Sequence, residues 1–450
     1  MLLALVLLAP FPPDVAQRLI GGALGDGVAY ARLAELADGI GPRLSGSPGA
    51  EAAVQWALRS FQKDGLAARL EPVKVPHWVR GEERGELLGS QPYPLALTAL
   101  GGSVSGDVTA EVIEARSLEL GPEVRGKIVF FNHDMHTPQG YGQFVELRTR
   151  GPSAAAKAGA VGVLLRSLST ASLRSPHTGV TVYDPSAPRI PAAAISVEDA
   201  QLIERQLARG AAVKAHFVLG CRWLPDADSA NVVAEVSGRE RPEEVVLLGA
   251  HLDSWDLAQG ANDDGAGVAM VMEAGRLIAA LPQPPRRTVR IVLFMNEENG
   301  LAGGKGYAAA HAAELARHVA AVEADSGAGR PLNITLHAGE GGEALLSAWL
   351  SPLQAALGIG LGGEGEAGGA DIGPMGPAQV PFAGVHVDAT HYFDIHHSAA
   401  DTLDKIDPQL LAQGAAAHAL LAYALAEMPQ PLPRPPPQPP RNRQEVPKAH

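Results

Sequence analysis

Residues 245–265 read VVLLGAHLDSWDLAQGANDDG. The stretch begins with a short apolar run that is typical of a buried β-strand, and His251 follows that run directly. It ends with Asn262-Asp263-Asp264-Gly265, just before a segment whose apolar residues have helical spacing. Ligand sites in open α/β sheets form in the crevice beyond the carboxyl ends of the strands. The stretch therefore predicts an α/β fold with a site at that edge.

Acidic residues and histidines also stand where later apolar runs end, or in the loops that follow them. In chain order, the candidate metal ligands and their neighbours are His251, Asp263, Glu297, Glu298, Asp325 and His397. They supply two imidazoles and several carboxylates, which is the ligand set of a paired zinc hydrolase. Because parallel strands share one carboxyl edge, a single crevice can collect all of them.

The chain has 450 residues, a formal net charge of -13 and a sequence pI near 5.6. This length predicts two or three domains, or one large domain with an insertion. Nucleic-acid binding depends on clusters of Lys and Arg that this acidic chain lacks, so we expect no nucleic-acid partner. Cys221 is the single cysteine, which excludes an intrachain disulfide.

The first residues, Met1 to Pro10, form a short apolar stretch without a basic region. We interpret residues 1–16 as a possible signal segment and expect a secreted or periplasmic protein. A buried N-terminal helix is the alternative interpretation. No later segment is long and apolar enough to cross a bilayer, so we expect no stable membrane span.

The pattern of apolar residues changes along the chain. Apolar residues recur at helical spacing between residues 49 and 63, and short β-rich runs separated by Gly, Pro and Ser follow. Later, apolar strands alternate with helical segments, which predicts a doubly wound, mostly parallel mixed sheet flanked by helices. The predicted parts are a catalytic domain formed by residues 17–86 and 221–428, a β-rich insertion at 87–220, and a Pro-rich disordered tail at 429–450.

The acidic residues near His251 allow more than one interpretation. A zinc-bound histidine usually donates its second ring N–H to a carboxylate, so Asp253 is a candidate for that catalytic supporting role. Asp263 and Asp264 precede a predicted helix, which one of them can cap. Two adjacent acids repel each other, however, and a divalent cation between carboxylates removes that repulsion. Both interpretations stay open, with metal binding favoured for Asp263.

Glu297 and Glu298 follow a strand that we expect to be buried on both faces. Adjacent carboxylates permit a division of labour, in which one holds a metal ion and the other takes a proton from water. An isolated pair of this kind is more often a solvated surface feature. The order of His, Asp, Glu-Glu, Asp and His around it favours the catalytic interpretation.

Five segments together resemble the co-catalytic dizinc exopeptidase family, which includes the zinc aminopeptidases, and most closely its plasma glutamate carboxypeptidase (carboxypeptidase Q) branch. They are residues 249–256 (GAHLDSWD), 260–265 (GANDDG), 296–298 (NEE), 323–325 (EAD) and 396–402 (HHSAADT). Residues 41–47 (GPRLSGS) and 78–81 (WVRG) are similar to the same branch. Residues 124–129 and 155–160 resemble a protease-associated domain.

The resemblance implies a zinc-dependent exopeptidase that hydrolyses dipeptides or short peptides, with the aminopeptidase, dipeptidase and carboxypeptidase modes all open. It implies two Zn²⁺ ions, a homodimer, and an insertion that covers the cleft. The implied residue roles are His251 and Asp325 at one ion, Glu298 and His397 at the other, Asp263 as the bridge, and Glu297 as the general base. The resemblance also implies a cis peptide after Asp263. Asp371 and Tyr392 are the candidate substrate-binding residues.

Two other functions remain as alternatives. A glutaminyl-cyclase-like acyltransferase shares the architecture but needs one zinc, and a receptor-like binding protein would be expected to have lost ligands. The presence of every ligand position favours the exopeptidase. We interpret His133 and His136 as solvated loop residues. We interpret His386, His391 and His396 as packing or substrate-side residues. The G-x-G-x-x-G match at 363–368 carries two acids where a pyrophosphate would lie, so no nucleotide site is expected there.

Overall fold

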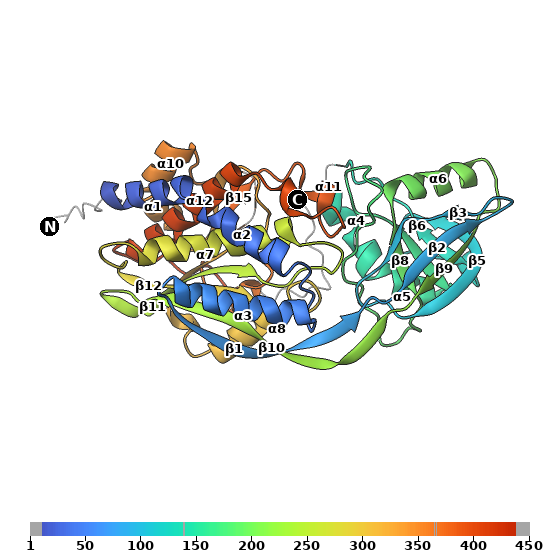
Figure 1. Cartoon of the computed structure of the whole chain (residues 1–450), viewed down its shortest axis with the longest axis horizontal. Helices are drawn as coiled ribbons and strands as arrows, with labels where there is room; N and C mark the ends of the chain where they lie inside the picture. The colour runs from blue at the N-terminus through green and yellow to red at the C-terminus, as the bar shows by residue number, and fades with distance from the viewer. Residues whose placement is uncertain (1–10, 138–139, 364, 366, 438–450) are drawn as a thin grey trace.

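The computed structural model describes residues 11–137, 140–363, 365 and 367–437. Figure 1 shows an elongated molecule with two lobes, each built around its own β-sheet. A long antiparallel ribbon of β1 (Ala67–Val79) and β10 (Arg222–Val236) runs between the lobes. Within the described residues, no helix has both the length and the apolar character that a bilayer span requires.

The first lobe contains the N-terminal and C-terminal parts of the chain. Its other strands are β11 (Arg241–His251), β12 (Arg287–Phe294), β13 (His318–Glu323), β14 (Pro331–His337) and β15 (Phe382–Val387). Its α-helices are α1 (Pro13–Gly25), α2 (Val28–Gly39), α3 (Pro48–Lys63), α7 (Ala266–Ala279), α8 (Ala302–Ala310), α9 (Gly342–Ser347), α10 (Ser351–Leu357), α11 (Tyr392–Ile395) and α12 (Pro408–Glu427). Short helical turns are η2 (Ala261–Gly265), η3 (Leu315–Arg317), η4 (Gly373–Ala378) and η5 (Leu403–Lys405).

The sheet of this lobe has the strand order β1-β10-β12-β11-β13-β15-β14. The four strands β12, β11, β13 and β15 run parallel, and the strands outside them are antiparallel to their neighbours. Parallel strands need crossover connections, and the helices of the lobe provide them. The predicted α/β architecture, a mixed sheet flanked by helices, is therefore confirmed, and its parallel strands are the four central ones.

The central strands are buried on both faces because helices cover each side of the sheet. In β12, Ile291 and Leu293 belong to the core that α7 and α12 complete. Val292 and Phe294 alternate with them and point to the other face, where the ring of Phe294 lies 5.9 Å from that of Tyr307 in α8. Two apolar faces per strand explain why the last residues of β12, from Ile291 to Phe294, are all apolar and do not alternate with polar residues.

A close contact of α7 with α12 fixes one of the covering layers. A Cβ atom on Gly414 in α12 would lie 2.2 Å from Sδ of Met270 in α7, so the methionine side chain occupies the space that the glycine leaves open. The segment after Gly265, whose apolar residues have helical spacing, forms α7, and Val268, Val271 and Met272 are buried in the same core.

The second lobe is formed by the middle of the sequence. Its strands are β2 (Glu83–Leu88), β3 (Tyr93–Pro94), β4 (Leu97–Ala99), β5 (Gly106–Ala115), β6 (Ile128–Phe131), β7 (Gly162–Arg166), β8 (Ala192–Ile195) and β9 (Lys214–Leu219). Its helices are η1 (Pro122–Val124), α4 (Gly140–Thr149), α5 (Gly151–Lys157) and α6 (Val197–Ala208). The strand order is β3-β2-β9-β5-β6-β7-β8-β4. The predicted boundary between residues 86 and 87 falls inside β2.

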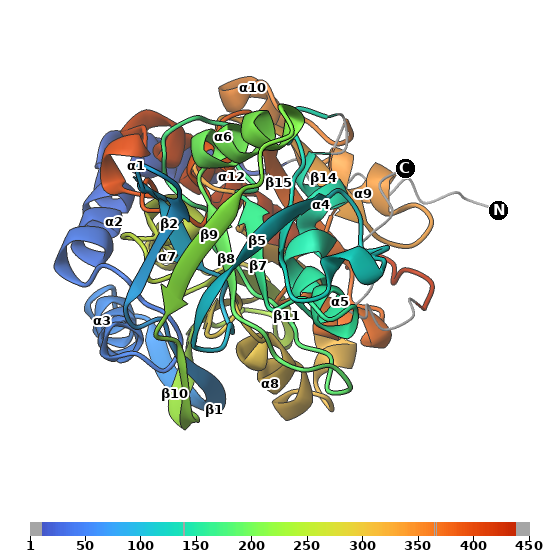
Figure 2. The ribbon, with the colours of Figure 1, turned by 90° about the vertical axis from the view of Figure 1, so that its right-hand side faces the viewer.

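Figure 2 views the molecule with the second lobe towards the reader. Trp255 of the first lobe packs among the buried residues of the second lobe, with its ring 6.5 Å from that of Trp78. A Cβ atom on Gly101 would lie 1.9 Å from the ring of Trp255, so the backbone of the second lobe lies directly against this indole. The contact joins the two lobes next to residues 251–265.

The ends of the chain correct two predictions. Phe11 is buried with its ring 5.1 Å from that of Tyr423, so residues 11–16 of the predicted signal segment belong to the fold. Arg434 donates hydrogen bonds to the carbonyls of Ala378 at 2.8 Å and His318 at 3.0 Å. These bonds and the burial of Leu432 hold residues 429–437 on the first lobe, and a disordered tail is wrong for that part. Residues 1–10 and 438–450 lie outside the described residues.

His133 is a further correction. It is buried in the second lobe, and its ring stacks on Phe144 with centroids 4.9 Å apart. Burial lowers the pKa of His133 to about 3, so it is a neutral core residue and not a solvated one. His136 is exposed as predicted, with Nδ1 2.9 Å from Asp134.

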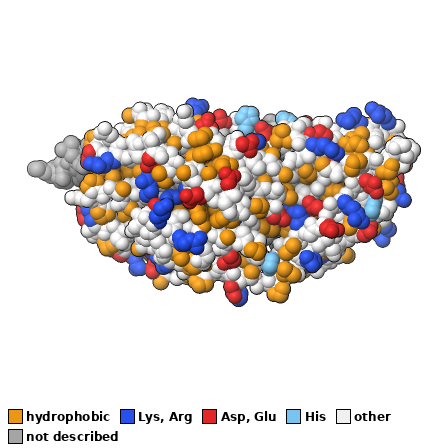
Figure 3. All heavy atoms as spheres, in the orientation of Figure 1, with side chains coloured by type: hydrophobic (Ala, Val, Ile, Leu, Met, Phe, Trp, Pro, Cys, Tyr) orange, Lys and Arg blue, Asp and Glu red, His pale blue; other side chains and the backbone are white. Residues whose placement is uncertain are grey.

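On the face shown in Figure 3, side chains of Lys and Arg are interspersed with those of Asp and Glu.

Candidate active site

The predicted ligands gather at one edge of the seven-stranded sheet. β11 ends at His251, and the segments that follow β12 and β13 carry Glu298 and Asp325. These strands are parallel neighbours, so their carboxyl ends reach the same edge. Asp263 lies in η2, between β11 and α7, and His397 follows α11.

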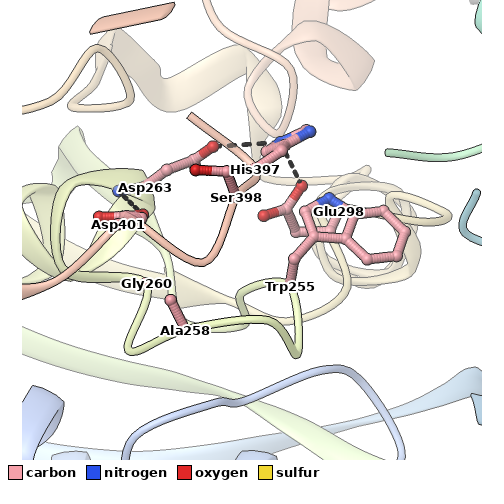
Figure 4. A pocket seen from close by; sticks show the side chains of 8 residues that line it. All are labelled: Trp255, Ala258, Gly260, Asp263, Glu298, His397, Ser398 and Asp401. Carbon is pink, nitrogen blue, oxygen red and sulfur yellow. Dashed lines mark hydrogen bonds and ion pairs between the residues drawn. The ribbon is translucent and has the colours of Figure 1, made fainter. Parts of the chain in front are cut away.

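Asp263 stands between the two histidines. Its Oδ1 lies 3.1 Å from Nε2 of His251, and its Oδ2 lies 3.1 Å from Nε2 of His397. Asp325 Oδ1 lies 3.5 Å from Nε2 of His251, and Glu298 Oε2 lies 2.9 Å from Nε2 of His397. The potential ligand atoms therefore form two groups of three that share Asp263, with all atoms of a group within 4.8 Å of one another. Figure 4 shows Asp263 and Glu298 on either side of His397.

The hydrogen bonds of His251 indicate what this arrangement can hold. Its Nδ1 lies 3.0 Å from the backbone carbonyl oxygen of Asp253, which can only accept, so Nδ1 carries a proton. In a neutral imidazole, Nε2 is then a lone pair, and it faces oxygens of Asp263 and Asp325. Lone pairs that face one another repel unless a positive charge lies among them. The donor set therefore fits a metal ion.

Asp253 contacts its neighbours through other atoms than predicted. Its backbone carbonyl accepts from His251, whereas its closest carboxylate oxygen is 3.8 Å from Nδ1. The carboxylate instead accepts from the backbone N–H groups of Glu297 at 3.0 Å and Glu298 at 3.4 Å, and from the hydroxyl of Ser45 at 3.2 Å. The predicted carboxylate–histidine hydrogen bond is wrong because these donors occupy the carboxylate. Asp253 fixes the backbone of the two glutamates.

Asp263 and Asp264 divide between them the two interpretations that the sequence allowed. The peptide bond between them is cis, as the resemblance implied. Asp264 accepts from the backbone N–H of Gly267 in the first turn of α7 at 3.1 Å, and from the backbone N–H of His251 at 3.1 Å. Asp264 therefore caps the helix. Asp263 is left to face the histidines.

Two buried residues hold the loop that carries Asp263. Asp401 accepts from the backbone N–H groups of Asn262 at 2.6 Å and Asp263 at 3.1 Å. Arg43 is fully buried and donates to the carbonyl of Gly260 at 3.0 Å. Burial lowers the pKa of Arg43 to about 10. Within the described part of the chain, this guanidinium bonds to backbone carbonyls and forms no ion pair with a carboxylate.

Burial disfavours negative charge at this edge of the sheet. It raises the pKa of Glu298 to about 8 and that of Asp325 to about 6. Burial acts on Asp263 too, but its close contacts with the imidazoles of His251 and His397 outweigh burial and hold the pKa of Asp263 well below its ordinary value. Carboxylates that are hard to ionise in such a site become favourable ligands beside a divalent cation.

A small cavity opens beside the cluster (Figure 4). Its lining residues are Trp255, Ala258, Gly260, Asp263, Glu298, His397, Ser398 and Asp401. Trp255 is also the residue that packs into the second lobe, so the wall of the cavity continues into that lobe.

The two predicted substrate-binding residues lie in different surroundings. Asp371 is fully buried, and its backbone N–H donates to the carboxylate of Glu323 at 3.1 Å. Burial raises the pKa of both side chains, to about 7 for Glu323. Tyr392 is half-buried, and its ring lies 4.9 Å from that of His396. Of the two, only Tyr392 reaches a surface that a substrate can approach.

The structure adds two histidines that the sequence analysis did not assign to the cluster. Nε2 of His396 lies 3.2 Å from Oδ2 of Asp263, and Nδ1 of His396 lies 2.9 Å from Nε2 of His177 in the second lobe. His396 adjoins His397 in the sequence, which was an available signal. His177 stands in an irregular segment with no periodicity to mark it. His386 and His391 are not part of these groups of described residues.

The sequence has extensive likeness to known peptidases. The profile of the family described as peptidase family M28 matches residues 231–422. Carboxypeptidase Q of Mus musculus is 39% identical over 430 residues, which cover 93% of this chain and 90% of that protein.

Solved structures extend the comparison. The peptidase M28 precursor of Shewanella amazonensis has a TM-score of 0.91 at 39% identity, covering 94% of this chain and 99% of that one. The zinc aminopeptidase of Bacillus subtilis has a TM-score of 0.63 at 21% identity, with 88% of this chain and 93% of that one covered, which is a likeness of fold.

Proposed function

The chain belongs to peptidase family M28 and is a metallo-exopeptidase, and from this premise we propose that it binds two zinc ions and hydrolyses dipeptides or short peptides. The family resemblance predicted from the motifs is confirmed. The observation that carries the dizinc proposal is the position of Asp263, whose two carboxylate oxygens each contact a different histidine. A carboxylate in that position can bridge two cations.

The proposed ligands follow from the two groups around Asp263. His251 and Asp325 hold one zinc ion, and Glu298 and His397 hold the other. Each group combines an imidazole with carboxylates, the nitrogen and oxygen ligands that zinc accepts. The lone pair of His251 Nε2, fixed by the bond of Nδ1 to a carbonyl, supports this assignment.

Glu297 is proposed as the general base. When bound, two zinc ions supply a water of lowered pKa and polarise the scissile carbonyl. The carboxylate of Glu297 takes the proton of the attacking water and returns it to the departing amine. Two features support the division of roles with Glu298. Glu298 is 5% exposed and points at His397, whereas Glu297 is half-buried and its backbone is held by Asp253.

The substrate is proposed to be a short peptide because the cavity beside the cluster is small and bounded by Trp255 and the second lobe. Tyr392, which lies against His396, is the proposed substrate-side residue. Asp371 is proposed to act through Glu323, which its backbone N–H contacts, and not by direct contact with substrate. The aminopeptidase, dipeptidase and carboxypeptidase modes differ in the terminus that is gripped, and a panel of blocked dipeptides distinguishes them.

Metal analysis coupled to a dipeptide hydrolysis assay tests the proposal. We expect two zinc ions per chain, loss of hydrolysis in a chelator, and recovery when zinc is returned. A metal-free preparation with full activity would contradict it. A single bound zinc with cyclisation of N-terminal glutamine would favour the acyltransferase alternative, which the two ligand groups sharing Asp263 argue against.

Three further predictions remain part of the proposal. The β-rich lobe is proposed to be a protease-associated domain, the protein to be secreted or periplasmic, and the assembly to be a homodimer. Cell fractionation of the full chain, followed by light scattering of the purified protein, tests the last two.

A further inference from the structure

The second lobe reaches the metal-ligand cluster through His177. This imidazole is fully buried, and its Nε2 lies 2.9 Å from Nδ1 of His396. Nε2 of His396 lies in turn 3.2 Å from Oδ2 of Asp263. A continuous row of polar atoms therefore connects a residue of the second lobe to the carboxylate that stands between the two metal groups.

The proton positions along this row follow from the acceptor at its end. A carboxylate only accepts, so a bare lone pair on His396 Nε2 facing Asp263 would be repulsive, and Nε2 carries the proton. In the neutral ring, Nδ1 of His396 is then the acceptor, and His177 must donate from Nε2. This leaves Nδ1 of His177 as a lone pair, and that atom has no hydrogen-bond partner among the described residues. Each oxygen of Asp263 has two lone pairs, so the contact leaves one of them on Oδ2 for a cation.

The neighbour of His177 holds the same segment by its backbone. Thr178 donates its N–H to the carbonyl of His397 at 2.8 Å, and its hydroxyl donates to the carbonyl of Ala99 at 2.9 Å. His397 has φ of 56°, a conformation that a non-glycine residue adopts only when its surroundings hold it there. The dipeptide of His177 and Thr178 thus contacts the side chain of one histidine and the backbone of the next.

A third metal site is the competing interpretation, because His177, His396 and His397 have ring nitrogens within 4.8 Å of one another. The ring planes argue against it. His397 is stacked on His396 at 21° and on His177 at 12°, so its ring plane lies beside theirs and is nearly parallel to them. Lone pairs lie in the ring planes, and those of stacked rings do not meet at one ion.

We propose that His177 is a positioning residue supplied by the second lobe, which sets the tautomer and orientation of His396 and thereby the placement of Asp263 and His397 at the metal centre. The inference rests on the proposed dizinc function. Direct hydrogen-bond partners of metal ligands change metal affinity or activity by about 10–100-fold when they are removed. His177 acts one contact further out, through His396, so the lower end of that range is expected.

The test compares His177→Phe, which keeps a ring of similar size without the donor, with His177→Gln, which restores an N–H donor. In the full-length zinc protein, we expect His177→Phe to lower kcat and zinc affinity by about 10-fold each, with KM nearly unchanged. His177→Gln should recover most of both. His133→Phe, the same change at a buried histidine of the same lobe, should leave kcat and zinc affinity as in the wild type.

Several results would overturn the inference. They are wild-type kcat and zinc affinity in His177→Phe, an equal loss in His177→Gln, or a third zinc ion that His177→Phe removes. Imidazole ¹⁵N NMR of His396 gives a readout that needs no zinc: the wild type should carry its proton on Nε2, and a proton on Nδ1 would overturn the inference. A wild-type protein without zinc or hydrolysis would instead contradict the proposed function, while the tautomer would still test His177.

Discussion

The carboxylates at the two ends of the central parallel strands have different partners. At the amino ends, the carboxylates meet guanidinium groups: Arg287 pairs with Glu244, and Arg239 pairs with Glu427. At the carboxyl ends, buried carboxylates and the half-buried Asp325 crowd together, and within the described residues none of them forms an ion pair with Lys or Arg. That set is Asp253, Asp263, Asp264, Glu298, Glu323, Asp325, Asp371 and Asp401.

The difference indicates which edge is built for stability and which for a ligand. A carboxylate paired with arginine has its counter-charge built into the chain. The carboxylates of the other edge face histidines and backbone N–H groups, and burial raises the pKa of most of them. Such an edge gains its compensating charge when cations bind.

The largest effect is expected from Asp263→Ala, which removes the carboxylate between the two histidines. Both zinc ions should be lost, and kcat/KM should fall by more than about a thousandfold, since losing even one electrostatic group of an active site costs about 10²–10³ in rate. Metal analysis and dipeptide hydrolysis measure the two outcomes. The matched control at the other edge is Glu244→Ala, which should keep the zinc content. A zinc-replete, active Asp263→Ala protein would remove the basis of the comparison.

Glu297→Gln separates metal binding from catalysis within the carboxyl edge. The amide cannot take the proton of water, so kcat should fall by about 10²–10⁴-fold while two zinc ions remain. Glu298→Gln should instead reduce zinc content, because Glu298 is the partner of His397. Turnover close to the wild type in Glu297→Gln would show that another group is the base.

The edge of the sheet that carries the site was predictable from the sequence because three of the five proposed ligands stand at or just beyond the exit of an apolar strand. Strand exits can be located from apolar runs, and parallel strands bring their exits together. That is why His251, Glu298 and Asp325 could be grouped without a structure. Asp263 and His397 depended more on the family resemblance, since they lie in loops whose course no periodicity determines.

Other features could not be predicted because they depend on contacts between distant segments. The link between His177 and His396 joins residues 219 positions apart and has no local pattern. The sequence placed Asp253 near His251. It could not predict that His251 would bond to the backbone carbonyl of Asp253 and not to its carboxylate. The proline-rich composition of residues 429–437 predicted a solvated tail, whereas Arg434 finds backbone carbonyls on the first lobe. Composition does not reveal such docking.

Arg287→Met tests the amino edge. Arg287 is fully buried, contacts Glu244 with Nε, and donates to the backbone carbonyl of Met428. Removing one partner of a fully buried ion pair destabilises a protein by about 3–5 kcal/mol. Glu244, the partner left behind, is 23% exposed, so the free energy of unfolding should fall by no more than that amount. The zinc content and the kcat of the folded protein should stay unchanged. Loss of zinc with unchanged stability would mean that the two edges are not independent.

His318, at the amino end of β13, extends the comparison to pH. Burial lowers its pKa to about 4, while Tyr307 donates to its Nε2 at 2.8 Å. The folded pKa of His318 lies below the unfolded value of about 6.5, so the neutral buried ring contributes to the free energy of unfolding. This contribution is fully present above pH 6.5 and is lost as the pH falls through 4. The loss should approach about 3 kcal/mol, and His318→Gln should flatten that part of the stability profile. Denaturant unfolding between pH 7 and pH 4 measures it.

The smallest effect is expected from Glu240→Gln, which breaks two exposed ion pairs at the same amino edge. Glu240 pairs with Arg286 and Arg239, but its side chain is 44% exposed, compared with 0% for Arg287. Water and salt screen an exposed pair, so the free energy of unfolding should change by less than about 1 kcal/mol, and by still less at high ionic strength. Chemical denaturation at low and high salt is the measurement. A loss as large as that of Arg287→Met would show that position at the edge, and not burial, decides what an ion pair contributes here.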